Sequence, residues 1–219
     1  MDIIVNGKII LTDKVIEGYN LAVRNGKIAD IYKDKNKYSG NIIDAGGNYV
    51  SPGFIDIHVH GGGEGDFLDG NIRSMENILN THTKHGTTGI FPTTLACDIS
   101  EIFDLIDNTN EILKSKKYYG KYAHILGLHL EGPYFSLSQR GAQDIKYIKD
   151  PDPKEYEKLL DYSNLIRRVT LAPELKGSLK LIDELVKRDI LPSIGHSDAE
   201  YGDVLKAYNH GATHVTHLY

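Results

Sequence analysis

Residues 54–62 read FIDIHVHGG, a β-prone run that ends in two histidines and a pair of glycines. Side chains two positions apart on a strand point to the same side, so His58 and His60 leave the backbone together, about 6–7 Å apart. Two imidazoles presented in this way suit either hydrogen bonding near a sheet edge or coordination of one metal ion. The rest of the chain has to distinguish these two interpretations.

From Phe54 onward, β-prone and helical segments alternate. Six strands separated by five helices predict parallel strands joined by crossovers, either in an open doubly wound sheet or in a (β/α)8 barrel. The glycine-rich stretch HGGGEGDFLDG lacks the Gly-x-Gly-x-x-Gly spacing of a dinucleotide-binding turn. The predicted strands are 54–60, 87–94, 123–130, 166–173, 191–196 and 213–218, and the predicted helices are 71–85, 99–115, 153–163, 178–189 and 200–210.

Residues 2–50 have a different pattern, with short β-prone runs joined by turns and no helical period of useful length. Asn6-Gly7 and Asn25-Gly26 each stand between two such runs and predict hairpins, because both residue types tolerate positive φ. Pro52-Gly53 then marks the change of pattern. We therefore predict a small β domain over 1–50 and an α/β domain over 51–219.

The predicted α/β domain is short for a closed barrel. Its six strands are two fewer than a (β/α)8 barrel needs, and such a barrel usually takes about 250 residues. The sequence of 219 residues also ends at Tyr219, directly after a predicted strand. We therefore expect an incomplete barrel that belongs to a longer polypeptide.

The composition excludes several classes of protein. Hydrophobic residues make up 40% and charged residues 25% of the chain, which is ordinary for a globular protein with a real core. The net charge of −5 argues against nucleic acid as the main partner. The single cysteine, Cys97, excludes an intrachain disulfide and fits a reducing compartment. Neither a signal peptide nor a membrane-length apolar run is present, so we expect a cytoplasmic protein without membrane contact.

Candidate metal ligands follow four of the predicted strands. His58 and His60 end the first strand of the α/β domain, and Glu131 follows the third. His196 and His217 end the fifth and sixth. Active sites of parallel α/β folds lie at the carboxyl ends of the strands, so these five side chains are expected at one rim. Neutral imidazoles with one carboxylate suit zinc or iron, and a carboxylate can bridge two ions, so the set predicts one or two divalent ions.

Three further residues have open roles. His129 shares a strand face with Glu131 and is either a group that orients a ligand or a core residue. Asp198 is either a hydrogen-bond acceptor near His196 or, as we favour, a helix N-cap. Cys97 lies near the predicted rim, but no partner in the sequence indicates a nucleophile.

Several motifs together resemble the N-acetylglucosamine-6-phosphate deacetylase family of the amidohydrolase superfamily. They are SPGFIDIHVHGGG, GTTGIFPTTLA, LGLHLEGPYFSLSQRGAQD, TLAPEL, SIGHSDA and GATHVTHLY, and they extend over essentially the whole chain. The resemblance implies that Glu131, His196 and His217 are the main metal ligands and that His58 and His60 form the pair found in two-metal members. It also implies that Ala142 and Gln143 contact the amino sugar.

The resemblance further implies a (β/α)8 barrel beside a small β-sandwich built from both chain termini, so residues 1–50 would supply only part of the sandwich. The family's catalytic aspartate would lie beyond Tyr219, which leaves no catalytic residue of this kind within the sequence. The implied partner is a small amino-sugar phosphate, and we expect a homodimer for the complete protein.

The implied reaction is hydrolysis of the acetamide of N-acetylglucosamine 6-phosphate. One alternative is another amidohydrolase, such as an adenine deaminase or a cyclic-amide hydrolase. Many relatives in the superfamily, such as dihydroorotases and dihydropyrimidinases, use a carboxylated lysine as the bridging ligand, where this sequence has Glu131. A second alternative is an inactive metal-binding fragment with open sheet edges.

Overall fold

The computed structural model describes residues 1–34 and 36–218, so Tyr219 lies outside the described part. The chain divides into two compact units, Met1–Gly53 and Phe54–Tyr219. Among the described residues, no helix is both long enough and apolar enough to span a bilayer.

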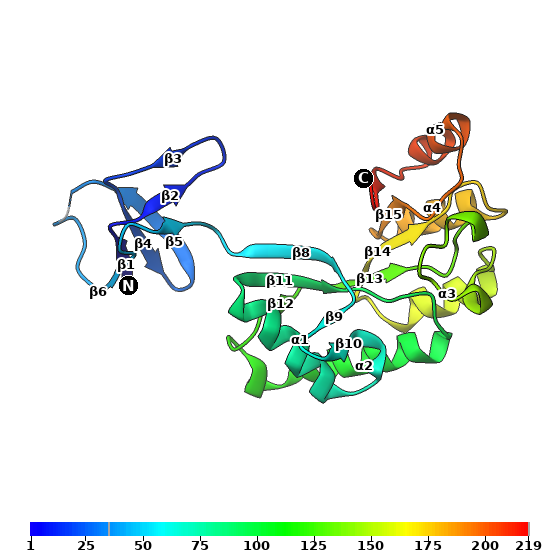
Figure 1. Ribbon diagram of the computed structural model, residues 1–219, viewed down its shortest axis with the longest axis horizontal. Coiled ribbons are helices and arrows are strands. Elements are labelled where there is room, and N and C mark those ends of the chain that lie inside the picture. Colours follow the sequence, from blue (N-terminus) through cyan, green and yellow to red (C-terminus); the bar gives the residue numbers. More distant parts are fainter. Residues whose placement is uncertain (35, 219) are drawn as a thin grey trace. The chain divides into compact units, whose positions relative to one another are not determined.

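The unit Met1–Gly53 consists of two small sheets (Figure 1). One has the strand order β5-β4-β1-β6, in which β1 is antiparallel to β4 and parallel to β6. The other has the order β3-β2-β7. Ile3, Ala22 and Tyr32 form the buried core of this unit. The strands are β1 Asp2–Val5, β2 Lys8–Ile10, β3 Val15–Ile16, β4 Asn20–Arg24, β5 Lys27–Tyr32, β6 Asn41–Asp44 and β7 Tyr49–Val50.

One of the two predicted hairpins is confirmed. Asn25 and Gly26 have φ values of 52° and 73°, and they join the antiparallel strands β4 and β5. The hairpin at Asn6-Gly7 was wrong, because β1 and β2 belong to different sheets. A two-residue hairpin of this type needs positive φ at both positions, whereas in this pair only Asn6 has one, at 55°. Gly7 instead allows a close approach, since a Cβ there would lie 2.5 Å from Val50.

In the unit that begins at Phe54, strands and helices alternate along the chain (Figure 1). All five predicted helices are present, with each end within two residues of its predicted position. The strands are β8 Phe54–Val59, β9 Gly61–Gly62, β10 Gly65–Asp66, β11 Thr87–Pro92, β12 His124–Ile125, β13 Leu128–Glu131, β14 Ile166–Leu171, β15 Leu191–Ile194 and β16 His214–Val215; the α-helices are α1 Ile72–Lys84, α2 Ile99–Lys114, α3 Pro153–Tyr162, α4 Ser178–Lys187 and α5 Tyr201–Asn209.

Seven of these strands form two parallel sheets with the orders β12-β11-β8 and β13-β14-β15-β16. An isolated parallel bridge between Thr93 and His129 joins one sheet to the other. The predicted strand at 123–130 is therefore two strands, β12 and β13, that pair in different sheets. The break falls at Gly127, where a Cβ would lie 2.3 Å from the Arg167 side chain. Only glycine allows β14 to approach this closely.

Side chains along β13 alternate between the hydrophobic core under the helices and the polar interior of the barrel. Leu128 and Leu130 belong to the large hydrophobic core with the helices, and the next positions, His129 and Glu131, point to the opposite side. The helices contribute buried apolar side chains to the same core: Met75, Ile78 and Leu79 from α1, Ile102, Leu105 and Ile106 from α2, and Leu181, Ile182 and Leu185 from α4.

The last two strands are shorter than predicted. β15 ends at Ile194 and β16 at Val215, so His196 and His217 lie beyond the strands instead of ending them. Both histidines have left-handed backbone conformations, with φ of 51° and 56°. Such a φ is incompatible with an extended strand, which is why regular pairing stops before each histidine.

We predict that Leu105→Ala destabilises the protein by about 2–5 kcal/mol, because Leu105 is fully buried and its truncation leaves a cavity in the core. Leu113→Ala is the matched control on the same helix, since Leu113 is 49% exposed. Urea unfolding of the two variants measures the difference. Equal losses of unfolding free energy would contradict the assignment of Leu105 to the core.

Candidate metal centre

The structure brings the five predicted ligands together, with four histidines around the carboxylate of Glu131. The Nε2 atoms of His217, His58 and His196 lie 2.8, 3.2 and 3.3 Å from Glu131 Oε1. The Nε2 atom of His60 lies 3.2 Å from Glu131 Oε2. Glu131 itself is 1% exposed, so the carboxylate lies beneath the histidines and not at the surface. We call these five side chains the cradle.

The side chains of the cradle form two groups that share Glu131. His58, His60 and Glu131 make one group, and Glu131, His196 and His217 make the other; within each, the ligand atoms lie within 4.8 Å of one another. The first pair of histidines comes from the end of β8, and the second from the segments that follow β15 and β16. One carboxylate therefore connects ligands from both sheets.

Two imidazoles of the cradle are held in a defined orientation. His60 Nδ1 lies 3.2 Å from the carbonyl oxygen of Thr93, and His196 Nδ1 lies 2.9 Å from that of Gln139. A carbonyl oxygen only accepts hydrogen bonds, so both Nδ1 atoms carry the proton. In the neutral ring, Nε2 then presents a lone pair toward the carboxylate. This is the arrangement in which a ligating histidine is fixed by a backbone carbonyl.

The donor set fits a divalent ion of the first transition row. A tetrahedral zinc site with bonds of about 2.0–2.1 Å to nitrogen separates neighbouring ligand atoms by about 3.3 Å. His58 Nε2 and His60 Nε2 are 3.2 Å apart, and their distances to Glu131 are similar. Lone pairs of neutral imidazoles placed this close to each other and to a carboxylate repel, so the geometry is satisfied by a cation between them.

Electrostatics in the cradle favour the ionised carboxylate. Burial opposes the charge of Glu131, but the hydrogen bonds that His196, His58 and His60 donate when their Nε2 atoms carry a proton hold the pKa of its carboxyl well below the usual range. For His60, burial lowers the pKa, yet the hydrogen bond and the charge of Glu131 raise it more. The hydrogen bond to Glu131 likewise raises the pKa of His196 against the effect of burial. Without a metal ion, the cradle therefore attracts protons.

The two residues predicted to contact a sugar lie in the loop after β13. Ala142 is exposed, whereas Gln143 is 6% exposed and donates from Nε2 to Glu131 Oε2 at 3.0 Å. The amide of Gln143 is itself fixed, because its Oε1 accepts a hydrogen bond from the Ala96 N–H at 2.7 Å. In the structure, Gln143 thus orients the Glu131 carboxylate.

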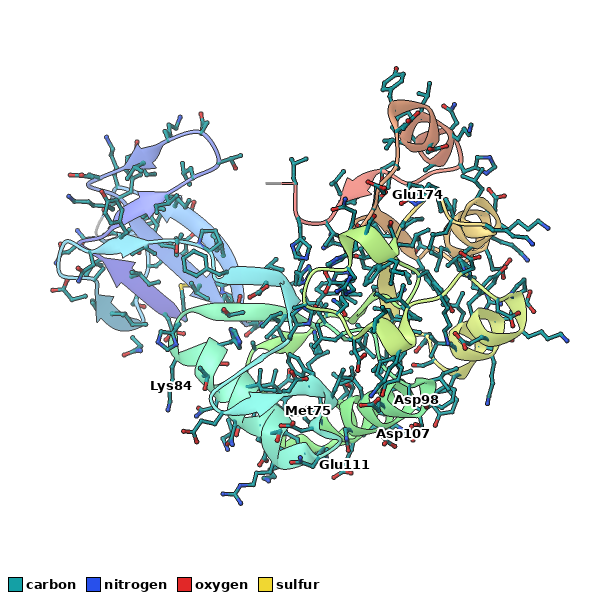
Figure 2. The ribbon with its side chains drawn as sticks, turned by 45° about the vertical axis from the view of Figure 1, so that its right-hand side comes forward. Met75, Lys84, Asp98, Asp107, Glu111 and Glu174 are labelled. Carbon is teal, nitrogen blue, oxygen red and sulfur yellow. The ribbon has the colours of Figure 1, made fainter. Side chains whose placement is uncertain are left out.

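Glu174 is a supporting residue that the sequence reasoning missed. It lies near the end of β14 and is labelled in Figure 2. Its carboxylate accepts hydrogen bonds from Ser197 Oγ at 2.7 Å and from the Asp198 N–H at 2.6 Å. These contacts fix the loop that carries His196. The signal was present in the motif TLAPEL, because a carboxylate that follows a strand obeys the same rule that identified Glu131.

The three residues with open roles are now placed. His129 is fully buried; its Nε2 is 2.7 Å from Thr170 Oγ1, and its ring packs edge-on against His58. The favoured role of Asp198 as a helix cap was wrong, since α5 begins after Glu200. Asp198 instead accepts a hydrogen bond from the Gln139 side chain at 3.2 Å. Burial raises the pKa of the Cys97 thiol to about 12, which agrees with the absence of a nucleophilic role.

The chain is similar to known proteins over most of its length. A model of the amidohydrolase family matches residues 49–219. The chain is 32% identical over 214 residues to the N-acetylglucosamine-6-phosphate deacetylase of Bacillus subtilis (strain 168), covering 96% of this chain and 54% of that protein. It is 27% identical over 205 residues to the N-acetylgalactosamine-6-phosphate deacetylase of Escherichia coli O157:H7, covering 93% and 52%.

Among solved structures, the N-acetylglucosamine-6-phosphate deacetylase from Pasteurella multocida superimposes with a TM-score of 0.88 at 31% identity, covering 99% of this chain and 56% of that one. The chain therefore spans about half the length of the relatives it matches. The predicted family resemblance and the predicted incomplete barrel with part of a sandwich are both confirmed.

We expect the affinity of the cradle for Zn²⁺ to rise with pH. A ligating imidazole must be neutral, and Glu131 raises the pKa of both His60 and His196 above their ordinary value of 6.5. Protons therefore compete with the ion up to a pH above 6.5. Competition with a chelator, measured on both sides of that pH, tests this. A half-point below 6.5 would contradict the proton-attracting cradle.

Glu131→Gln should weaken Zn²⁺ binding by at least about a hundredfold, because it removes the one negative charge that both groups of ligands share. Glu155→Gln is the matched control, since Glu155 hydrogen-bonds Tyr134 and Lys149 and takes no part in the cradle. Metal content after dialysis, measured by mass spectrometry, compares the two. Retention of the ion by Glu131→Gln would exclude Glu131 as the bridging ligand.

Proposed function

The chain belongs to the amidohydrolase family, and from this premise we propose that the complete protein hydrolyses the acetamide of N-acetylglucosamine 6-phosphate to glucosamine 6-phosphate and acetate. The observation that carries the proposal is the buried Glu131 carboxylate in contact with four imidazole Nε2 atoms. The names of the relatives supply the substrate class, because a metal cradle alone does not choose between amides.

The cradle would hold one or two divalent ions, zinc or iron, with Glu131 as the shared ligand. The chemistry that a bound ion supplies is polarisation of the amide carbonyl and a lowered pKa for water. The protein's part is to hold the ligands in place and to exclude bulk water. Phe135, 1% exposed, packs its ring against His196 with centroids 4.4 Å apart. The loop after β13 also covers His196, since a Cβ at Gly141 would lie 3.5 Å from its ring.

Substrate contact is proposed for Ala142 and Gln143. Both are in the loop that covers the cradle, and the Gln143 amide lies beside the bridging carboxylate. Transfer of the proton from water to the departing amine is assigned to the aspartate that the resemblance places after Tyr219. Homodimer formation and a cytoplasmic location of the complete protein stay predictions.

Other amidohydrolase reactions are less well supported. Many other amidohydrolases, such as dihydroorotases and dihydropyrimidinases, use a carboxylated lysine as the bridging ligand, and the family resemblance assigns that position to Glu131 in this chain. One relative, 27% identical to this chain, is named as a deacetylase of the epimeric sugar N-acetylgalactosamine 6-phosphate. The epimer is therefore the comparison substrate of choice.

We expect the full-length protein to release acetate from N-acetylglucosamine 6-phosphate, to lose this activity with a chelator and to regain it with Zn²⁺ or Fe²⁺. The assay compares kcat/KM for this sugar, for N-acetylgalactosamine 6-phosphate, for adenine and for a cyclic amide. Glu131→Gln serves as the inactive control. Absence of acetate release after the ion is restored, or a higher kcat/KM for adenine or the cyclic amide, would reject the proposal.

A further inference from the structure

A buried arginine lies inside the barrel, under the cradle. Arg168 is 6% exposed and shares a face of β14 with Thr170. The interior of a (β/α) barrel is usually filled by branched apolar side chains, and a buried charge is costly without partners. The partners that the structure gives to Arg168 are three uncharged oxygens, and its Nε has none among the described residues.

Each of these oxygens belongs to a segment that carries a histidine of the cradle. Arg168 Nη2 donates to Thr216 Oγ1 at 2.9 Å, and Thr216 directly precedes His217. Nη2 also donates to Ser193 Oγ at 3.0 Å, on the strand that leads to His196.

Arg168 Nη1 lies 3.4 Å from the carbonyl oxygen of Ile57, which directly precedes His58. One guanidinium thus contacts the three segments that carry all four histidines of the cradle.

The contact with Ile57 connects the two sheets through the barrel interior. Figure 1 shows β8 in the sheet with β11, while β14 and β15 belong to the other sheet. Along the backbone, the described bridge between the sheets is the pair Thr93 and His129. Arg168 reaches from β14 to β8 on the inner side of the barrel. This contact holds the segments that carry the two ligand groups of the cradle at a fixed separation.

A hydroxyl network extends this connection toward the cradle. Thr216 Oγ1 lies 2.7 Å from Ser193 Oγ and 2.8 Å from Thr170 Oγ1. Thr170 Oγ1 is in turn 2.7 Å from His129 Nε2, and the His129 ring packs edge-on against His58 at 4.9 Å between centroids. His58 is therefore reached from Arg168 both through the backbone of Ile57 and through packed side chains.

We propose that Arg168 is a positioning residue of the metal centre, whose forked guanidinium fixes β8, β15 and β16 so that the histidines of both groups converge on Glu131. The proposal rests on the metal-binding part of the proposed function and not on the identity of the substrate. Charge alone does not explain the arginine, because a positive group beneath a cation site repels the cation. If Arg168 acts by fixing the strands, its removal should weaken binding of the ion. If only its charge mattered, its removal should strengthen binding.

The test measures Zn²⁺ affinity of the full-length protein by chelator competition, and the absorption spectrum of the Co²⁺-loaded form, which reports ligand geometry. Arg168→Met keeps most of the side-chain length but removes the fork and the charge. We expect it to weaken Zn²⁺ binding roughly ten- to a hundredfold and to change the Co²⁺ spectrum. Arg168→Lys, which can reach fewer of the three oxygens, should restore part of the affinity.

Thr216→Val provides a second route if Arg168→Met fails to fold. It removes the hydroxyl that Arg168 contacts and nearly preserves the shape, and we expect a weakening of Zn²⁺ binding in the same direction. Thr109→Val is the matched control: Thr109 is equally buried in α2, and its hydroxyl has no hydrogen-bond partner among the described residues. Zn²⁺ affinity of this control should be unchanged.

Unchanged or tighter Zn²⁺ binding in folded Arg168→Met, or in Thr216→Val, would overturn the proposal and leave only an electrostatic or packing role. Because the readout is ion binding, it is independent of acetate release. A wild-type protein that binds Zn²⁺ without deacetylase activity would reject the proposed substrate and still allow Arg168 to be tested.

Discussion

The ionised carboxylate of Glu131, removed from water, is the constraint on which the rest of the α/β unit depends. A charge that is 1% exposed is stable only if its surroundings replace the lost hydration. Here the amide of Gln143 donates a hydrogen bond to the carboxylate. The four imidazoles donate to it when their Nε2 atoms carry a proton and, as neutral rings, would hold a balancing cation beside it. These groups come from several strands and loops, so the contacts of the Glu131 side chain position residues around the whole rim.

Much of this arrangement could be predicted from the sequence, because it follows from two regularities. Side chains alternate along a strand, which put His58 and His60 on one side and Glu131 on the face opposite Leu130. Parallel strands also end at a common edge, which placed His196 with them although it is distant in sequence. The helices were predicted well for a similar reason, since their apolar period and caps are local features.

The remaining features depend on contacts between distant segments, and no local pattern contains them. Asn6-Gly7 has the composition of a hairpin, but the chain uses it to pass from one sheet to another. The strand that breaks at Gly127 looks continuous in sequence, and only the approach of β14 requires the break. Gln143 and Arg168 owe their surroundings to residues far away in the chain. The sequence gives their residue types, an amide and a cation, but does not indicate which residues they contact.

The backbone at His196 and His217 has a consequence for how this protein can change. Both residues adopt a φ that asparagine or glycine tolerates with less strain, and neither of those supplies an imidazole. Relief of this backbone strain by asparagine or glycine would therefore remove the contacts of both imidazoles with Glu131. Histidine at these two positions thus couples a strained backbone conformation to the ligand set, and neither feature can change without the other.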